Sequence, residues 1–159
     1  MTANPGSLKE RYEAVLDRVS SAASASARSL DDIKVIVVSK NHPAQLVLDL
    51  IDFGARDFGE NRDQEAAPKA AEVASVSAVE LNWHFVGQLQ SNKVKSVLKY
   101  ASSVHSIDRD SLRKAISKEV NSIRESAIDF VESQMFKRIK EGSDTMIIFF
   151  LKTQAKSRG

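Results

Sequence analysis

The chain has 159 residues, of which 42% are apolar and 28% charged, a composition typical of one globular domain. Its 23 basic and 21 acidic residues leave a net charge of +2, so charge alone indicates neither a nucleic-acid nor a membrane-surface partner. The lack of cysteine excludes disulfide bonds, thiolate metal sites and a cysteine nucleophile. Residues 1–16 have no apolar segment of the signal-peptide type, and the longest apolar run, residues 146–151, is too short to span a bilayer, so a cytoplasmic protein is expected.

Helix and strand patterns alternate from the start of the chain. Residues 8–23 predict a helix opened by Ser7, because apolar residues recur there every three to four positions. Residues 33–39 predict a strand covered on both faces, because branched apolar residues dominate a short run. A helix is expected next over residues 44–53, ending at Gly54 as a left-handed cap.

The same unit recurs in the rest of the chain. Further strands are expected at residues 56–59, 82–87, 103–107 and 146–151, and further helices at residues 62–73, 91–100, 109–123 and 125–142. This alternation predicts an α/β fold with parallel strands and right-handed crossovers. Five such strands fit either an open doubly wound sheet or most of a barrel.

Four polar residues fall at or just after the carboxyl ends of the expected strands, where α/β folds place their ligands: Lys40, Asn61, Gln88 and Asp108. Most lysines at strand ends are solvated. Lys40, however, follows the apolar residues 35–38, whose low polarity would disfavour its ammonium form and leave a nucleophilic amine suited to forming an imine with an aldehyde.

The other polar positions have structural interpretations beside the functional ones. Asn61 is either a helix N-cap or a hydrogen-bond donor and acceptor for a ligand near Lys40. Asp108 is placed to cap the following helix. Gln88, Ser91 and Asn92 either bind an anion or cap a helix. The acidic residues Glu60, Asp63 and Glu65 are expected to be solvated or favourable to the helix dipole.

The histidines give a weak signal. His84 lies within an expected strand and is more simply a hydrogen-bonded core residue than a ligand. A metal site made of His42, His84 and His105 can be drawn, but no pair of them has short ligand spacing. The sequence contains no GxGxxG, P-loop, HExxH or GxSxG motif.

Four motifs in order identify a resemblance: VSKNHP (residues 38–43), FGENRDQE (58–65), WHFVGQLQSNK (83–93) and HSIDR (105–109). They resemble the YggS/PROSC family of pyridoxal 5'-phosphate (PLP) homeostasis proteins over residues 8–124. The resemblance implies a (β/α)8 TIM barrel like the N-terminal domain of alanine racemase, with PLP held as an imine on Lys40 and with Asn61 in the cofactor pocket. It also implies vitamin B6 homeostasis without an established catalytic reaction.

The sequence itself favours binding over catalysis. Racemisation through PLP needs a second acid or base facing the lysine, commonly a tyrosine, and neither Tyr12 nor Tyr100 falls on the expected ligand rim. Family members run well beyond this length. The chain is therefore expected to form one partial barrel domain over residues 1–159, with about five βα units, truncated after the fifth strand.

Truncation has expected consequences. The loops that hold the phosphate in the family come from the later units, so PLP binding is expected to be weak. An incomplete barrel leaves unpaired sheet edges, which predict self-association. The alternatives to a PLP-binding module are an inert or interaction-only remnant and a racemase-like PLP enzyme.

Overall fold

The computed structural model describes residues 6–141. The chain divides into two compact units, Met1–Ala115 and Ile116–Gly159, and each is considered by itself. The first unit holds the sheet, its helices and every candidate site residue. In the second unit, the structure describes the greater part of one long helix.

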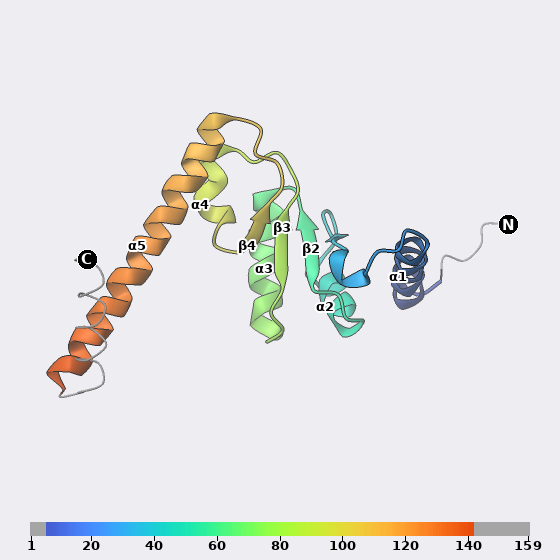
Figure 1. The fold of residues 1–159 in the computed structure, drawn as a ribbon, viewed down its shortest axis with the longest axis horizontal. Coiled ribbons are helices and arrows are strands. Elements are labelled where there is room, and N and C mark those ends of the chain that lie inside the picture. The colour runs from blue at the N-terminus through green and yellow to red at the C-terminus, as the bar shows by residue number, and fades with distance from the viewer. Residues whose placement is uncertain (1–5, 142–159) are drawn as a thin grey trace. The chain divides into compact units, whose positions relative to one another are not determined.

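Four parallel strands form one sheet in the described residues, in the order in which they occur in the chain (Figure 1). These are β1 (Val37–Val38), β2 (Asp57–Glu60), β3 (Asn82–Phe85) and β4 (Ala101–Val104). The register pairs Val38 with Gly59, and Gly59 with His84. Sequential order without reversal is the arrangement of successive units in a β/α barrel, whereas a doubly wound sheet reverses its order at a switch point. The prediction of an incomplete α/β barrel is therefore confirmed.

Helices connect the strands. They are α1 (Leu8–Ala25), α2 (Ala44–Asp52), α3 (Asp63–Val76), α4 (Val94–Val97) and α5 (Asp110–Lys140), with short 3-10 turns η1 (Leu30–Asp32) and η2 (Ser91–Lys93). Ser7 caps α1 as predicted: its Oγ accepts from the backbone N–H of Glu10, whose carboxylate accepts from the backbone N–H of Ser7. Gly54, with φ of 94°, ends α2 as predicted.

The core lies between one face of the sheet and helices α2 and α3. It contains Ala44, Val47, Leu50, Ile51, Ala55, Phe58, Ala70, Val73 and Trp83. The rings of Phe58 and Trp83, on adjacent strands, are 5.8 Å apart between centroids. Because side chains alternate along a strand, the residues before and after these two face the other side of the sheet. That alternation decides which polar residues can meet there.

Several element boundaries differ from the sequence prediction. The strand expected over residues 33–39 is only Val37–Val38, because the residues before it form no ladder with β2. The expected helix over residues 91–100 consists of η2 and the single turn α4. Strand β4 starts at Ala101 rather than at residue 103.

Helix α5 is continuous over 31 residues, so the expected end near residue 123 and new start near residue 125 are wrong. Residues 124–125 are arginine and glutamate, which are good helix formers, and neither glycine nor proline occurs before residue 142 in this helix. The fifth expected strand, residues 146–151, lies outside the described residues, and the single-domain expectation remains a prediction. No helix in the described part of the chain is long and apolar enough to cross a membrane.

Candidate functional site

The carboxyl ends of β1 and β2 carry Lys40 and Asn61. Val38 and Gly59 are paired in the sheet, and each candidate lies two residues beyond its paired strand residue. A turn follows β1 at once: the backbone N–H of His42 donates to the carbonyl oxygen of Ser39 at 3.1 Å. Both candidates therefore emerge at the same end of the sheet, on neighbouring strands.

Lys40 is exposed. In β1, Val37 packs toward the core, whereas Val38 faces the other side of the sheet and is 48% exposed. The apolar enclosure expected around the amine is therefore not formed by the described residues. That expectation rested on a strand covered on both faces, but the helices cover the sheet on one side.

A buried ion pair lies directly beneath this end of the sheet. The ammonium of Lys69, on α3, donates to Oε1 of Glu60 at 2.7 Å and to the carbonyl oxygen of Ser39 at 2.9 Å. The hydroxyl of Ser39 donates to the same Oε1 at 2.7 Å. Glu60 is 1% exposed and Lys69 is 7% exposed. Because Ser39 precedes Lys40 and Glu60 precedes Asn61, this Ser39–Glu60–Lys69 cluster joins the two chain segments that carry the candidates.

The sequence interpretation of this cluster was wrong. The sequence predicts that Glu60 is solvated or favourable to the helix dipole, but it is buried and paired with Lys69. A usable signal was present, because Lys69 lies three residues after Ala66 and four before Val73, on the stripe of α3 that faces the core. A lysine on such a stripe requires a buried partner.

Asn61 is not the N-cap of α3. The cap position is Arg62, and it makes no side-chain capping bond. Oδ1 of Asn61 is buried and accepts no hydrogen bond from the described residues. An unpaired buried carbonyl oxygen costs about 1–3 kcal/mol, a cost that a hydrogen bond donated by a ligand would remove.

Gly87 fixes the loop after β3 against Asn61. A Cβ at position 87 would lie 2.8 Å from both Cα and Cβ of Asn61, closer than real Cβ atoms approach. Only glycine therefore fits where this loop crosses the end of β2. The glycine of the VGQ sequence was the signal for this approach, and the sequence interpretation did not use it.

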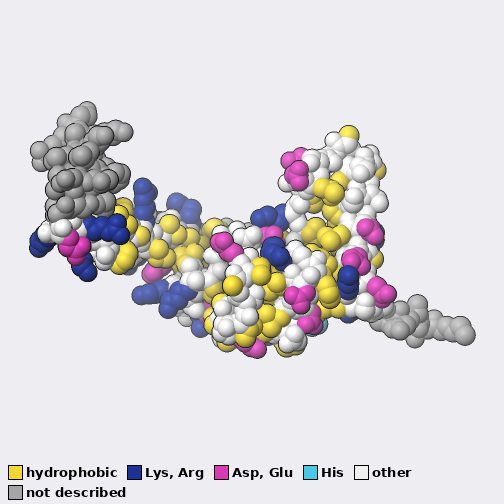
Figure 2. Space-filling view, turned by 90° about the horizontal axis from the view of Figure 1, so that it is seen from below, with side chains coloured by type: hydrophobic (Ala, Val, Ile, Leu, Met, Phe, Trp, Pro, Cys, Tyr) yellow, Lys and Arg dark blue, Asp and Glu magenta, His cyan; other side chains and the backbone are white. Residues whose placement is uncertain are grey.

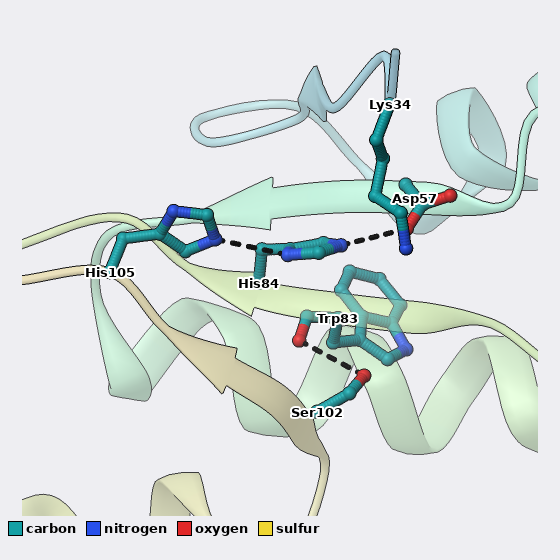
Figure 3. Close-up of polar contacts among 6 residues, drawn as sticks. All are labelled: Lys34, Asp57, Trp83, His84, Ser102 and His105. Carbon is teal, nitrogen blue, oxygen red and sulfur yellow. Dashed lines mark hydrogen bonds and ion pairs between the residues drawn. The ribbon is translucent and has the colours of Figure 1, made fainter. Parts of the chain in front are cut away.

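A polar network occupies the face of the sheet opposite the core (Figure 3). Nε2 of His84 lies 2.8 Å from Oδ1 of Asp57, and its Nδ1 lies 3.0 Å from Nε2 of His105. Lys34 Nζ is 3.2 Å from the same Asp57 oxygen. His84 is thus a buried, hydrogen-bonded strand residue, as predicted.

The three-histidine metal site is not formed. His42 lies in the turn after β1, whereas His84 and His105 contact each other. No group of three potential metal ligands comes together in the described residues.

The carboxyl group of Asp57 responds to opposing influences. Burial raises its pKa, but the hydrogen bonds from His84 and Lys34 and the positive charge of Lys34 outweigh burial, so the net pKa is lowered. Asp57 is therefore stabilised in its ionised form, as the common partner of a lysine and a histidine on the open face of the sheet.

The remaining rim residues bond to one another. Gln88 Nε2 donates to Oδ2 of Asp108 at 3.0 Å, and Arg109 Nη1 donates to Oδ1 of Asp108 at 2.6 Å. Both bonds are made by the carboxylate of Asp108, which was predicted to cap the following helix. That helix, α5, begins at Asp110. Neither Ser91 nor Asn92 is the cap of η2, since that position is Gln90 and makes no side-chain capping bond.

Neither tyrosine is positioned in the chain at the carboxyl end of a strand. Tyr12, on α1, packs against the core, and Tyr100 follows α4 and precedes β4, at the amino end of that strand. Burial raises the pKa of Tyr100, as do the nearby charges of Asp63 and Glu60. A phenol so disposed is a poor proton donor or acceptor near neutral pH.

Comparison with known proteins identifies relatives of the first unit. No family model matches the chain. The pyridoxal phosphate homeostasis protein of Escherichia coli is 41% identical over 95 residues, which cover 60% of this chain and 41% of the relative. The protein of the same name from Pseudomonas aeruginosa is 38% identical over 112 residues, covering 70% and 47% respectively.

Solved structures give the same result. PipY from Synechococcus elongatus, solved with PLP bound, matches with a TM-score of 0.56 and 35% identity over 64% of this chain and 47% of its own. A protein of unknown function from Bifidobacterium adolescentis matches with a TM-score of 0.66 and 30% identity, covering 72% and 49%. The chain thus spans about half the length of the relatives it matches.

We expect Lys69→Met to lower the free energy of unfolding by about 3–5 kcal/mol, because it leaves the Glu60 carboxylate buried without its cation. Urea unfolding would measure the loss. Arg62→Met is the matched control, since the Arg62–Glu65 pair is largely exposed and should contribute less than about 1 kcal/mol. Equal losses in the two variants would contradict a structural role for the buried pair.

Asp57→Asn should destabilise the protein by about 1–2 kcal/mol near pH 7. The pKa of Asp57 is lowered by folding, so its contribution is complete above its ordinary value of 3.8 and disappears as the pH falls through the lower native value. The difference in unfolding free energy between wild type and variant should therefore narrow in acid. Asp52→Asn, at an exposed position on α2, controls for the loss of one carboxylate; a difference that widened below pH 4 would refute the assignment.

Proposed function

We propose that this chain, which belongs to the YggS/PROSC family, binds PLP as an imine on Lys40 and contributes to PLP homeostasis in the cytoplasm. The main support is that Lys40 and the unpaired side-chain oxygen of Asn61 follow the carboxyl ends of two neighbouring strands. The names of the relatives and the PLP-bound PipY structure support the choice of cofactor.

The residues present fit the cofactor chemically. The Lys40 nitrogen would attack the aldehyde carbon of PLP and water would leave, forming the C=N bond. Oδ1 of Asn61 would accept a hydrogen bond from a donor on the bound molecule, which would satisfy an otherwise unpaired buried atom. PLP, when bound, supplies a reactive aldehyde that the protein can hold and release.

The Ser39–Glu60–Lys69 cluster would keep these two groups in register. It contacts the chain one residue before each of them, so movement of Lys40 relative to Asn61 requires breaking buried charge-assisted bonds. Preorganisation of this kind reduces the conformational cost of binding.

We propose that the protein binds PLP without turning over a substrate. Tyr12 lies on α1 and Tyr100 packs against the core with a phenol whose pKa is raised by burial, so neither is suited to supply the opposing acid or base that racemisation requires. Sustained racemisation of an amino acid above the rate with free PLP would favour the racemase-like alternative.

Lys40→Arg should abolish the imine absorption band that appears when PLP is added, because arginine keeps the charge but forms no stable imine. Borohydride reduction followed by peptide mapping should locate the modification at residue 40 in the wild type. Lys114→Arg, at an exposed position of α5, controls for adventitious reaction of surface lysines. Asn61→Ala should keep the band but weaken PLP binding about tenfold, equivalent to about 1.4 kcal/mol.

A band that persists unchanged in Lys40→Arg would reject the lysine assignment. A well-folded wild-type protein that forms no band at all would favour the alternative of a remnant without PLP binding.

We also propose that the chain self-associates through its sheet edges. Strands β1 and β4 each have a strand neighbour on one side in the described residues. Unpaired edges are templates for pairing with a second chain. Figure 2 shows apolar side chains exposed between charged ones, and among the exposed residues is Val38 of β1.

Sedimentation over about a hundredfold range of concentration should show a mass that rises with concentration, as mass action requires. Ser103→Lys, at an exposed position of β4, should shift the equilibrium toward monomer by about tenfold, because edge lysines oppose pairing. Ser111→Lys is the matched control, because it adds the same charge on α5 and not on β4, and it should leave the association equilibrium unchanged. Equal sedimentation of both variants and the wild type would argue against association through β4.

A further inference from the structure

The middle of α5 is exposed all round. Residues 120–134 are exposed without exception, a run of about four helical turns (Figure 1). Large apolar side chains nevertheless occur in it: Val120, Ile123 and Phe130 are 47%, 54% and 65% exposed. Soluble proteins rarely leave a contiguous apolar face in water, so this face indicates a surface that another chain covers.

The apolar residues of α5 are spaced as in a coiled coil. Successive members are alternately four and three residues apart: Ile116, Val120, Ile123, Ala127 and Phe130. This mean spacing of about 3.5 residues is the heptad repeat, in which the a and d positions face a partner helix. Val120 and Ala127 then occupy a positions, and the other three occupy d positions. All five lie on α5 within the second unit, and together they form one apolar seam.

The charged residues beside the seam are complementary to those of an identical helix. Glu119 directly precedes Val120, at a g position, and Arg124 directly follows Ile123, at an e position. In a parallel pair of helices, a g residue faces the e residue five positions later on the other helix. Glu119 of one copy therefore faces Arg124 of the second copy, and two-fold symmetry repeats the pair. Neither side chain has an ion-pair partner among the described residues.

The same charges disfavour an antiparallel arrangement. In that arrangement g positions face g positions and e positions face e positions. The other flanking residues of the seam are uncharged: Ser117 and Val131 at e positions, and Ser126 at a g position. Within the seam, Glu119 would then meet no cation and Arg124 no anion. The charges therefore favour a second copy of this helix in parallel orientation.

We propose that α5 pairs in parallel with α5 of a second copy through residues 116–130, with Glu119 of each copy bonded to Arg124 of the other. This interface goes beyond the proposed cofactor function and does not require PLP. It also differs from the sheet-edge association, because it uses no strand. The seam is shorter than the roughly three to four heptads that identify a coiled coil from sequence, so the dimer should be weak and concentration-dependent.

Sedimentation of the full chain carrying Ser103→Lys, which suppresses pairing through β4, tests the interface. The mass should rise toward that of two chains between about 10 µM and 1 mM. Adding Ile123→Lys should weaken association by at least about tenfold, because it places a charge in the apolar seam. Ser122→Lys is the matched control: it adds the same charge at the adjacent c position, outside the seam, and should change association less than about twofold.

Both substituted positions are exposed, and lysine is a good helix former, so neither variant should disturb α5 itself. Circular dichroism at a concentration where the chain is monomeric checks that the helix content is unchanged. A loss of association in Ile123→Lys at constant helix content then reports on the interface alone.

A charge exchange tests the pairing of Glu119 with Arg124. Glu119→Arg and Arg124→Glu should each weaken association by about threefold to tenfold, because each replaces an attraction by a repulsion. The double variant restores opposite charges and should associate within about twofold of the unexchanged chain. A merely structural role of either residue would give additive losses instead.

The lack of cysteine in the chain allows a direct test of orientation. Ala127→Cys places one thiol at an a position, which in a parallel pair lies beside the same residue of the second copy. Oxidation with diamide should therefore join two chains by a disulfide. Ser122→Cys, an exposed thiol outside the seam, is the control and should cross-link at least about fivefold more slowly.

Four results would overturn the proposal. The first is a mass that stays at one chain up to about 1 mM, which would mean that no second copy covers this face. The second is an equal effect of Ile123→Lys and Ser122→Lys. The third is a charge exchange that fails to restore association. The fourth is equal cross-linking of Ala127→Cys and Ser122→Cys, which would exclude the parallel orientation.

Discussion

The candidate site depends on one buried cation. Lys69 extends from α3 beneath the sheet and donates at once to the Glu60 carboxylate and to the carbonyl oxygen of Ser39. Desolvating an ammonium and a carboxylate costs several kcal/mol, which is recovered only if the pair is close and its remaining positions are hydrogen-bonded. Here the Ser39 hydroxyl supplies one of those bonds to Oε1 of Glu60, whereas Oε2 has no hydrogen-bond partner among the described residues. The geometry of the strand ends is therefore fixed by an interaction that tolerates little displacement.

Contacts at the strand ends also hold the segments that follow β2, β3 and β4 in place. Asn61 directly follows Glu60 of the buried pair in the chain. Gly87 lies so close to Asn61 that the loop after β3 has little conformational freedom. Arg109 extends this arrangement to the segment after β4 through its bond to the Leu89 carbonyl. Three consecutive βα connections are thus joined by specific contacts rather than by loop length alone. A rigid rim is suited to binding, because less conformational entropy is lost when a ligand arrives.

The two faces of the sheet have different physical character. Helices α2 and α3 cover one face with an apolar core, while the other carries the Asp57–His84–His105 network and the half-exposed Val38. In a closed barrel, such a face would line the interior. In this chain, which spans about half the length of its relatives, the network holds together β2, β3 and the segment after β4 by hydrogen bonds instead of apolar packing.

The sequence by itself determined the alternation of elements, the Ser7 cap and the end of α2 at Gly54, because these follow from local periodicity and backbone preference, and its short motifs carried the resemblance to the PLP homeostasis proteins. It also indicated which strand ends carry polar residues. Only the tertiary structure decided that β1 is covered on one side and that Glu60 is buried with Lys69 rather than solvated. The reason is physical: burial and charge pairing depend on which residues meet when the elements pack, and Glu60 and Lys69 lie nine positions apart in the chain, one on β2 and the other on α3.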